Sequence, residues 1–114
     1  MAIKLNLEML AHCYDMLAAT AIMSKWNLPT SEDIKFKLVP RKKYFGRYIY
    51  DGGDHIIEIS TKGVGTFTTL ISTMSHEMIH LHQSTLDIPV ADDAAFEFFS
   101  EMVCKELELD RLAF

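Results

Sequence analysis

The chain carries an H-E-x-x-H motif at His76-Glu77-Met78-Ile79-His80. On a helix, positions four residues apart lie on one face, so His76 and His80 can present both imidazoles to a single Zn²⁺ ion. Glu77 is then placed to act as general base on a metal-activated water. The motif therefore predicts a helix that carries the chemistry of metal-assisted hydrolysis.

The residues around the motif have the period of an amphipathic helix. At about 100° per residue, apolar and polar positions separate onto opposite sides. The apolar positions are Phe67, Leu70, Ile71, Met74, Met78 and Leu81, and the polar ones are Thr69, Thr73, His76, His80 and Gln83. Thr66 is the predicted N-cap, and Pro89 prevents continuation, so we expect a helix over residues 67–85. His82 points about 120° away from His76 and is predicted to be a surface or partly packed residue rather than a ligand.

The segments on either side of this helix predict an α+β fold. Residues 7–25 form an expected first helix capped by Asn6, and residues 91–109 an expected last helix. Between them, alternating or aromatic-rich stretches predict strands over residues 34–38, 44–50 and 55–60, with Asp51-Gly52-Gly53-Asp54 as a hairpin turn. The expected fold is zincin-like, with an N-terminal helix, a small three-stranded antiparallel or mixed sheet, the H-E-x-x-H helix and a C-terminal helix.

Length and composition indicate one folded domain spanning residues 1–114. An apolar share of 49% with 24% charged residues is ordinary for a globular protein and excludes a disordered chain. The formal charge of −5 argues against direct nucleic-acid binding by this domain, although six basic residues cluster between Lys35 and Arg47.

The lack of a secretory or membrane-spanning pattern, together with the cysteine spacing, predicts a cytoplasmic protein. The N-terminus lacks the apolar core of a secretory signal, and no window has the length of a membrane span, so no membrane partner is expected. Cys13 and Cys104 have no C-x-x-C spacing, and we expect two buried thiols of a reducing compartment.

A catalytic zinc site generally uses three protein ligands, so the last helix must supply one more. Its candidates are Asp92, Asp93, Glu97 and Glu101. Asp92 shares its face with the apolar stripe that begins at Phe96, and a carboxylate at the head of such a stripe needs a partner. Asp92 is thus the predicted third ligand, with Asp93 and Glu97 as alternatives. The competing interpretation is that Asp92 only favours the helix N-terminus through the dipole.

Residues 44–107 resemble the SprT-like zincin metalloproteases in their minimal form. The resemblance rests on the strand Gly46-Arg47-Tyr48, a hairpin into Ile56-Ile57-Glu58-Ile59, the H-E-x-x-H helix and a last helix. In that family the last helix opens with His-Gly-x-x-Phe, and its histidine is the third zinc ligand. Here Asp92-Asp93-Ala94-Ala95-Phe96 corresponds to it, with Asp92 in the place of the histidine.

The motif and the resemblance together imply a zinc-dependent metallopeptidase. His76, His80 and Asp92 would hold Zn²⁺, and Glu77 would be the catalytic general base. A peptide or protein substrate would pair with residues 56–60 if these form an edge strand. Asp87 or Glu58 are candidates to orient a ligand histidine. The alternative is a non-catalytic zincin-fold binding or adaptor module with weak or no metal.

Overall fold

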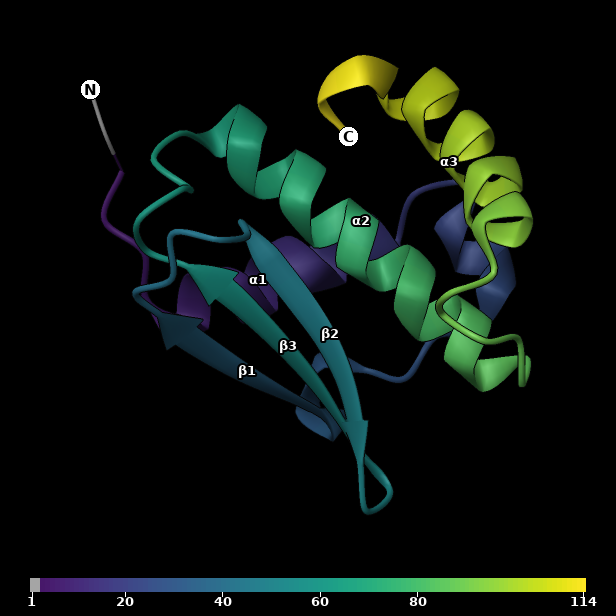
Figure 1. Cartoon of the computed structure of the whole chain (residues 1–114), viewed down its shortest axis with the longest axis horizontal. Helices are drawn as coiled ribbons and strands as arrows, with labels where there is room; N and C mark the ends of the chain where they lie inside the picture. The colour runs from purple at the N-terminus through teal and green to yellow at the C-terminus, as the bar shows by residue number, and fades with distance from the viewer. Residues whose placement is uncertain (1–2) are drawn as a thin grey trace.

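The computed structural model describes residues 3–114, apart from the side chain of residue 113. Its helices are α1 (Leu7–Ala18), α2 (Phe67–Thr85) and α3 (Asp93–Leu107), and its strands are β1 (Ile34–Val39), β2 (Gly46–Asp51) and β3 (Asp54–Ser60). Three short 3₁₀ helices join them: η1 (Met23–Trp26), η2 (Ser31–Asp33) and η3 (Arg111–Ala113). Three α-helices and a three-stranded mixed sheet confirm the predicted α+β class (Figure 1).

The sheet has the order β1-β3-β2, with β1 parallel and β2 antiparallel to β3. The expectation that residues 56–60 form an edge strand is therefore wrong, because β3 lies in the centre. The predicted tight turn is present, since Gly52 and Gly53 both have positive φ and link β2 to β3 as a hairpin. The edge strand beside α2 is β2 (Figure 1).

The strand register places alternate residues on a face that meets the helices. Phe36, Ile57 and Tyr48 form one cross-strand row, and Ile34, His55 and Tyr50 form the next. Phe36, Ile57 and Tyr48 pack with α1 and α2 in one hydrophobic core. Lys35, Lys37 and Arg47 lie at the opposite parity along their strands and are exposed, so the basic cluster lies on the other face.

The first helix is shorter than its apolar pattern predicts. Asn6 caps α1 as expected by accepting from the Met9 amide, but the helix ends at Ala18 rather than Lys25. Beyond it, the Ile22 amide donates to the carboxylate of Glu106 on α3, and Met23 is buried in η1. This contact between distant parts of the chain replaces the continuing helical bonds.

Helix α2 is the central element of the fold. It packs against α1, α3, β2 and β3, and it spans the predicted residues with Thr66 as its cap. Because α3 covers one of its sides, the face predicted to be polar is partly buried: Thr73 and Gln83 lie inside the protein. The α2 helix thus carries its histidines into a shielded part of the molecule.

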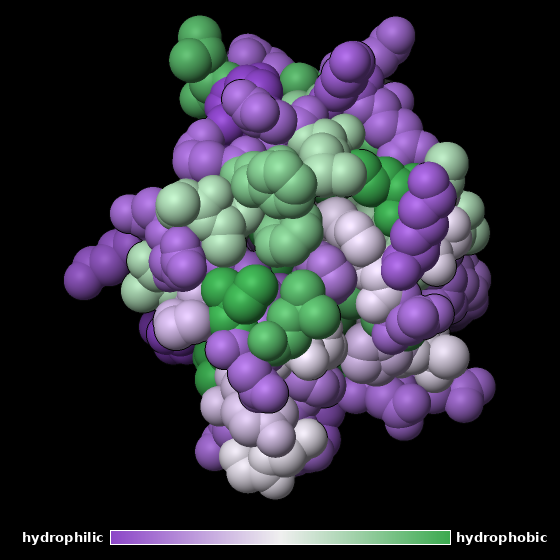
Figure 2. All heavy atoms as spheres, turned by 90° about the vertical axis from the view of Figure 1, so that its right-hand side faces the viewer, coloured by the Kyte–Doolittle hydropathy of each residue, from purple (hydrophilic) through white to green (hydrophobic). Residues whose placement is uncertain are grey.

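The face that carries α3 and the loop before it displays several apolar side chains (Figure 2). Hydrophilic residues surround them in this view. Leu86, Val90, Phe98 and Met102, from α3 and the loop before it, are exposed. Across residues 3–114, the helices are either too short or too polar to cross a bilayer. Cys13 and Cys104 are buried thiols, as predicted.

Candidate metal centre

His76 and His80 project from consecutive turns of α2 toward a common space. Their ring centroids lie 5.0 Å apart, with an angle of 69° between the ring planes. Both rings are half-buried, because α3 lies against this side of α2. The helix therefore brings the two predicted ligands together, as the spacing requires.

Gln83 fixes the orientation of His80. The Gln83 side chain is fully buried, and its amide nitrogen donates to the main-chain oxygens of Pro89 at 3.1 Å and Asp92 at 3.3 Å. Since a main-chain oxygen only accepts, the amide oxygen of Gln83 must face the imidazole, and His80 Nδ1 donates to it at 2.9 Å. This hydrogen bond leaves the lone pair of His80 Nε2 available for a metal ion.

His76 is oriented in the same manner by a different group. Its Nδ1 donates to the main-chain oxygen of Phe114 at 3.1 Å. Both candidate ligands thus have a protonated Nδ1 held by a carbonyl acceptor and an unprotonated Nε2. Metal-binding histidines in proteins are generally held by such an outer hydrogen bond. The expected orienting groups Asp87 and Glu58 are not the ones found, since Glu58 instead accepts from Tyr44 and Arg47.

Glu77 is buried between α2 and the edge strand β2. A Cβ atom added at Gly46 would lie 2.7 Å from Thr73 Cγ2 and 3.3 Å from Glu77 Cγ, so the glycine permits this close approach. Burial raises the pKa of Glu77 to about 8, and a hydrogen bond from the Tyr48 main chain opposes the rise. At pH 7 this carboxyl group is therefore mostly protonated in the metal-free protein, and its carboxylate form is a stronger base than that of an exposed glutamate.

The two imidazoles are covered by an aromatic ring from α3. Phe96 lies 4.5 Å from the His76 ring and 4.7 Å from the His80 ring, stacked on the latter. Desolvation lowers the pKa of His76 to about 4, with a smaller effect from His80, and it also lowers the pKa of His80. Both histidines are thus neutral at pH 7, the state in which imidazole binds a metal.

The side chain of Asp92, the predicted third ligand, is the N-cap of α3 in this structure. Its side chain caps α3 by accepting from the Ala95 amide at 3.1 Å, while its main-chain oxygen accepts from Gln83. Among residues 3–114, no three histidine, cysteine or acidic side chains are grouped so that they could hold a metal ion. The structure brings His76, Glu77 and His80 together. Asp92 lies beside them and is connected to His80 through the hydrogen bonds of Gln83.

The remaining acidic side chains of α3 point elsewhere. Glu97 pairs with Arg111, and Asp93 and Glu101 are exposed.

His82, predicted not to be a ligand, is buried between Trp26 and Phe99. The Trp26 ring stacks on the His82 ring at 4.2 Å. The helical period thus places His82 apart from the other two histidines, but the residue is buried rather than on the surface or partly packed.

A groove passes the histidine pair between β2 and the helices. One cavity of about 190 Å³ is lined by Gly46, His76 and Glu77, and another of about 280 Å³ by Gly46, Glu77 and His80. Gly46 and Glu77 line both cavities, so the two lie next to each other along the edge strand. An extended chain bound to this edge would pass directly over Glu77.

Gln83 is the residue of this site that the sequence prediction missed. It was assigned to the polar face of α2 but given no role. The sequence does contain a signal for this role, because residues three apart on a helix are neighbours and an amide can accept from an imidazole.

No family model matches the chain, and no curated protein and no solved structure is significantly similar to it. The SprT-like resemblance therefore stays a prediction.

Proposed function

We propose that this protein is a zinc-dependent metallopeptidase with a zincin-like fold. The observation that carries the proposal is the matched orientation of His76 and His80. Each donates its Nδ1 proton to a carbonyl acceptor, and each keeps Nε2 for a metal. The presence of a glutamate directly after the first histidine, buried against the edge strand, distinguishes this arrangement from a chance histidine pair.

The residues present fit Zn²⁺ after two rearrangements. His76 Nε2 and His80 Nε2 are two of the three ligands that a catalytic site needs. Asp92 remains the proposed third ligand, because its main chain already contacts Gln83, the partner of His80. Ligation requires the Asp92 carboxylate to exchange the Ala95 amide for the metal and the Phe96 ring to move from the imidazoles.

The chemistry divides between the metal and Glu77. A zinc ion in this place supplies a Lewis acid that activates water at neutral pH. The Glu77 carboxylate takes the proton from the attacking water and passes it to the leaving amine. Its burial favours this task, since a carboxyl group with a raised pKa holds a proton more readily than an exposed one.

The proposed substrate is an extended peptide or protein segment. No strand pairs with the outer edge of β2 within residues 3–114, so such a segment could add to the sheet there as a further strand. The groove along β2 would then hold the scissile bond over Glu77. This role belongs to β2 and replaces the role expected for residues 56–60.

A second candidate function is a non-catalytic binding or adaptor module. It is favoured by the Phe96 ring stacked on His80 and by the Asp92 side chain engaged as a helix cap. In that case the groove binds an extended segment without cleaving it. The two candidates share the binding surface and differ in the metal.

Hydrolysis of fluorescently labelled casein by zinc-loaded protein tests the proposal. Wild type should release labelled peptides, and 1,10-phenanthroline should abolish the release. Glu77→Gln should bind zinc as wild type does and hydrolyse nothing, because the isosteric amide cannot accept a proton from water. A Glu77→Gln protein that loses zinc and hydrolysis equally would contradict this division of roles, and inactive zinc-loaded wild type would favour the adaptor.

A further inference from the structure

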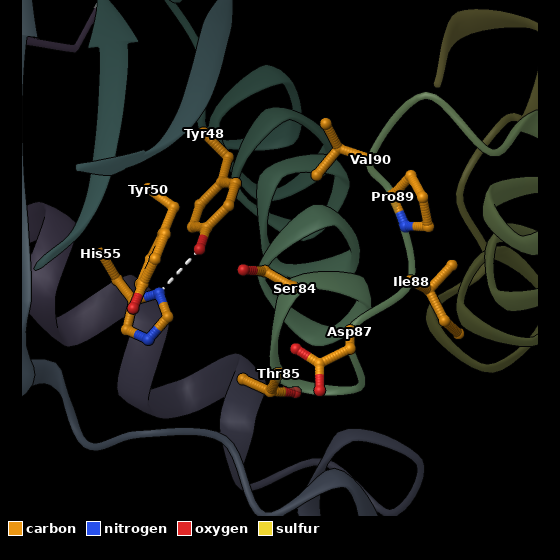
Figure 3. Close-up of a pocket in the computed structure, with 9 residues that line it drawn as sticks. All are labelled: Tyr48, Tyr50, His55, Ser84, Thr85, Asp87, Ile88, Pro89 and Val90. Carbon is orange, nitrogen blue, oxygen red and sulfur yellow. Dashed lines mark hydrogen bonds between the residues drawn. The ribbon is translucent and has the colours of Figure 1, made fainter. Parts of the chain in front are cut away.

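A larger pocket lies beyond the histidine pair, at the C-terminal end of α2. Its volume is about 640 Å³, and it opens between β2 and the loop that follows α2 (Figure 3). Tyr48 and Val90 line both this pocket and the cavity beside Glu77 and His80. A chain that lies along β2 over Glu77 therefore reaches this pocket with a neighbouring side chain.

Aromatic rings line the pocket on the side of the strands. The Tyr48 hydroxyl is hydrogen-bonded to His55 Nδ1 at 2.6 Å, and the Tyr50 ring lies 5.2 Å from the His55 ring. The Tyr50 side chain is 59% exposed, so its ring is accessible to a ligand. Such a ring attracts a cation to its face. Burial lowers the pKa of His55, so this imidazole is neutral at pH 7 and does not repel a cation.

The helix side of the pocket presents Asp87. Its backbone is left-handed, with φ of 57°. Two hydrogen bonds hold this turn: the Asp87 amide donates to the main-chain oxygen of Ser84, and the Ile88 amide donates to that of Gln83. In Figure 3 the Asp87 carboxylate lies at the pocket, near Ser84 and Thr85. Its position follows the last turn of α2, where the helix dipole already favours positive charge.

Asp87 violates one local preference without compensation inside the protein. A left-handed position accepts aspartate as it does asparagine, but a helix C-terminus disfavours a carboxylate. Within residues 3–114 the Asp87 side chain makes neither a hydrogen bond nor an ion pair. Residues that break local rules in this manner are expected at functional sites.

We propose that this pocket binds an arginine or lysine side chain of the peptide or protein that lies along β2. Asp87 is the only formally charged side chain lining the pocket at pH 7, in the part of the chain that the structure describes. The cation would lie between the Asp87 carboxylate and the Tyr50 ring, and the carbonyl end of α2 adds to the attraction. The proposal rests on the proposed function, because it names the substrate class of the same groove.

Binding of short peptides to Glu77→Gln protein tests the assignment without cleavage. The probes are fluorescein-labelled nonapeptides of alanine and serine with one arginine, moved through each inner position, and matched peptides with uncharged, isosteric citrulline. At low ionic strength the best arginine peptide should bind about fivefold tighter than its citrulline partner, the effect of one partly solvated ion pair. Asp87→Asn should reduce this ratio to about 1, since asparagine keeps the left-handed turn and loses the charge.

Glu108→Gln is the matched control. Glu108 is an exposed acidic residue at the end of α3 with φ of 56°, so its substitution removes the same charge from the same kind of position away from the pocket. This variant should keep the fivefold ratio. Equal binding of the arginine and citrulline peptides, a preference that survives Asp87→Asn, or no peptide binding at all would each overturn the assignment.

Cleavage of the same peptides by wild type separates this inference from the proposed function. An arginine preference in binding without any cleavage supports the pocket and contradicts the peptidase. Cleavage without an arginine preference supports the peptidase and contradicts the pocket.

Discussion

Gln83 accepts a hydrogen bond from His80 Nδ1 at 2.9 Å, and its own amide nitrogen is fixed by the main chain of Pro89 and Asp92. One buried side chain therefore joins a candidate metal ligand on α2 to the start of α3. The direction in which His80 presents Nε2 depends on this connection. The two hydrogen bonds from the Gln83 amide nitrogen link α2 to Pro89 and to Asp92, the N-cap of α3.

Replacement of Gln83 by methionine, which is similar in size, should weaken zinc binding about 10–100-fold, because the His80 ring loses its orienting acceptor. It should also destabilise the fold by about 1–3 kcal/mol, since the acceptors on Pro89 and Asp92 lose their donor. Competition with a chromophoric chelator measures the first effect. Gln83→Glu keeps an acceptor for His80 and should bind zinc more tightly than Gln83→Met; equal affinities for all three proteins would contradict the orienting role.

In metal-free protein, Glu77 should make stability depend on pH. Its pKa is raised from 4.5 to about 8, so its contribution is fully present below pH 4.5 and is lost as pH rises through 8. The unfolding free energy of wild type, relative to that of Glu77→Gln, should therefore fall over this range by on the order of 5 kcal/mol. Urea unfolding of both proteins across the range measures it. A difference that does not change with pH would show that Glu77 is not buried as described.

Gly46→Ala should destabilise the protein by about 1–3 kcal/mol through overpacking, because the new Cβ would lie 2.7 Å from Thr73 Cγ2. Thr73→Ser removes that methyl group, so the double variant should recover part of the loss. A double-mutant cycle by urea unfolding measures the coupling. Purely additive effects would mean that β2 and α2 are less closely packed at this point.

Phe96→Ala in metal-free protein should raise the pKa of His76 from about 4 toward its ordinary value of 6.5, because the ring that shields the imidazole from water is removed. Phe99→Ala is the matched control, since Phe99 contacts the His82 ring at 4.8 Å. Titration of the histidine side chains by NMR in both variants measures these pKa values. A His76 pKa unaffected by Phe96→Ala, or raised equally by Phe99→Ala, would contradict the shielding.

The parts of this fold that depend on local pattern were predictable. The bounds of α2, its Thr66 cap, the Asn6 cap and the glycine turn all follow from neighbouring residues. The pairing of β1 with β3 was not, because alternation shows that a strand is half-buried but not which strand it meets. The early end of α1 depends on Glu106, a residue 84 positions from its partner Ile22.

In the candidate site, too, the features that depend on local pattern were predictable and those that depend on contacts between elements were not. The helical period placed His76, Glu77 and His80 together and excluded His82, since all four lie on one helix. The period also identified the inward stripe of α3, where Phe96 contacts both imidazoles. It did not decide whether the Asp92 side chain would cap its own helix or reach across to another, because that choice depends on one rotamer.

Zinc content is the most direct test of the proposed site. Elemental mass spectrometry should find about one zinc ion per chain in wild type and in the control His12→Ala, and none in His76→Ala. Asp92→Ser keeps a side chain that can cap α3 and removes the carboxylate, so it should lose zinc without losing the fold. Wild type that holds no zinc, even after zinc is added, would contradict the metallopeptidase and leave the adaptor function in its place.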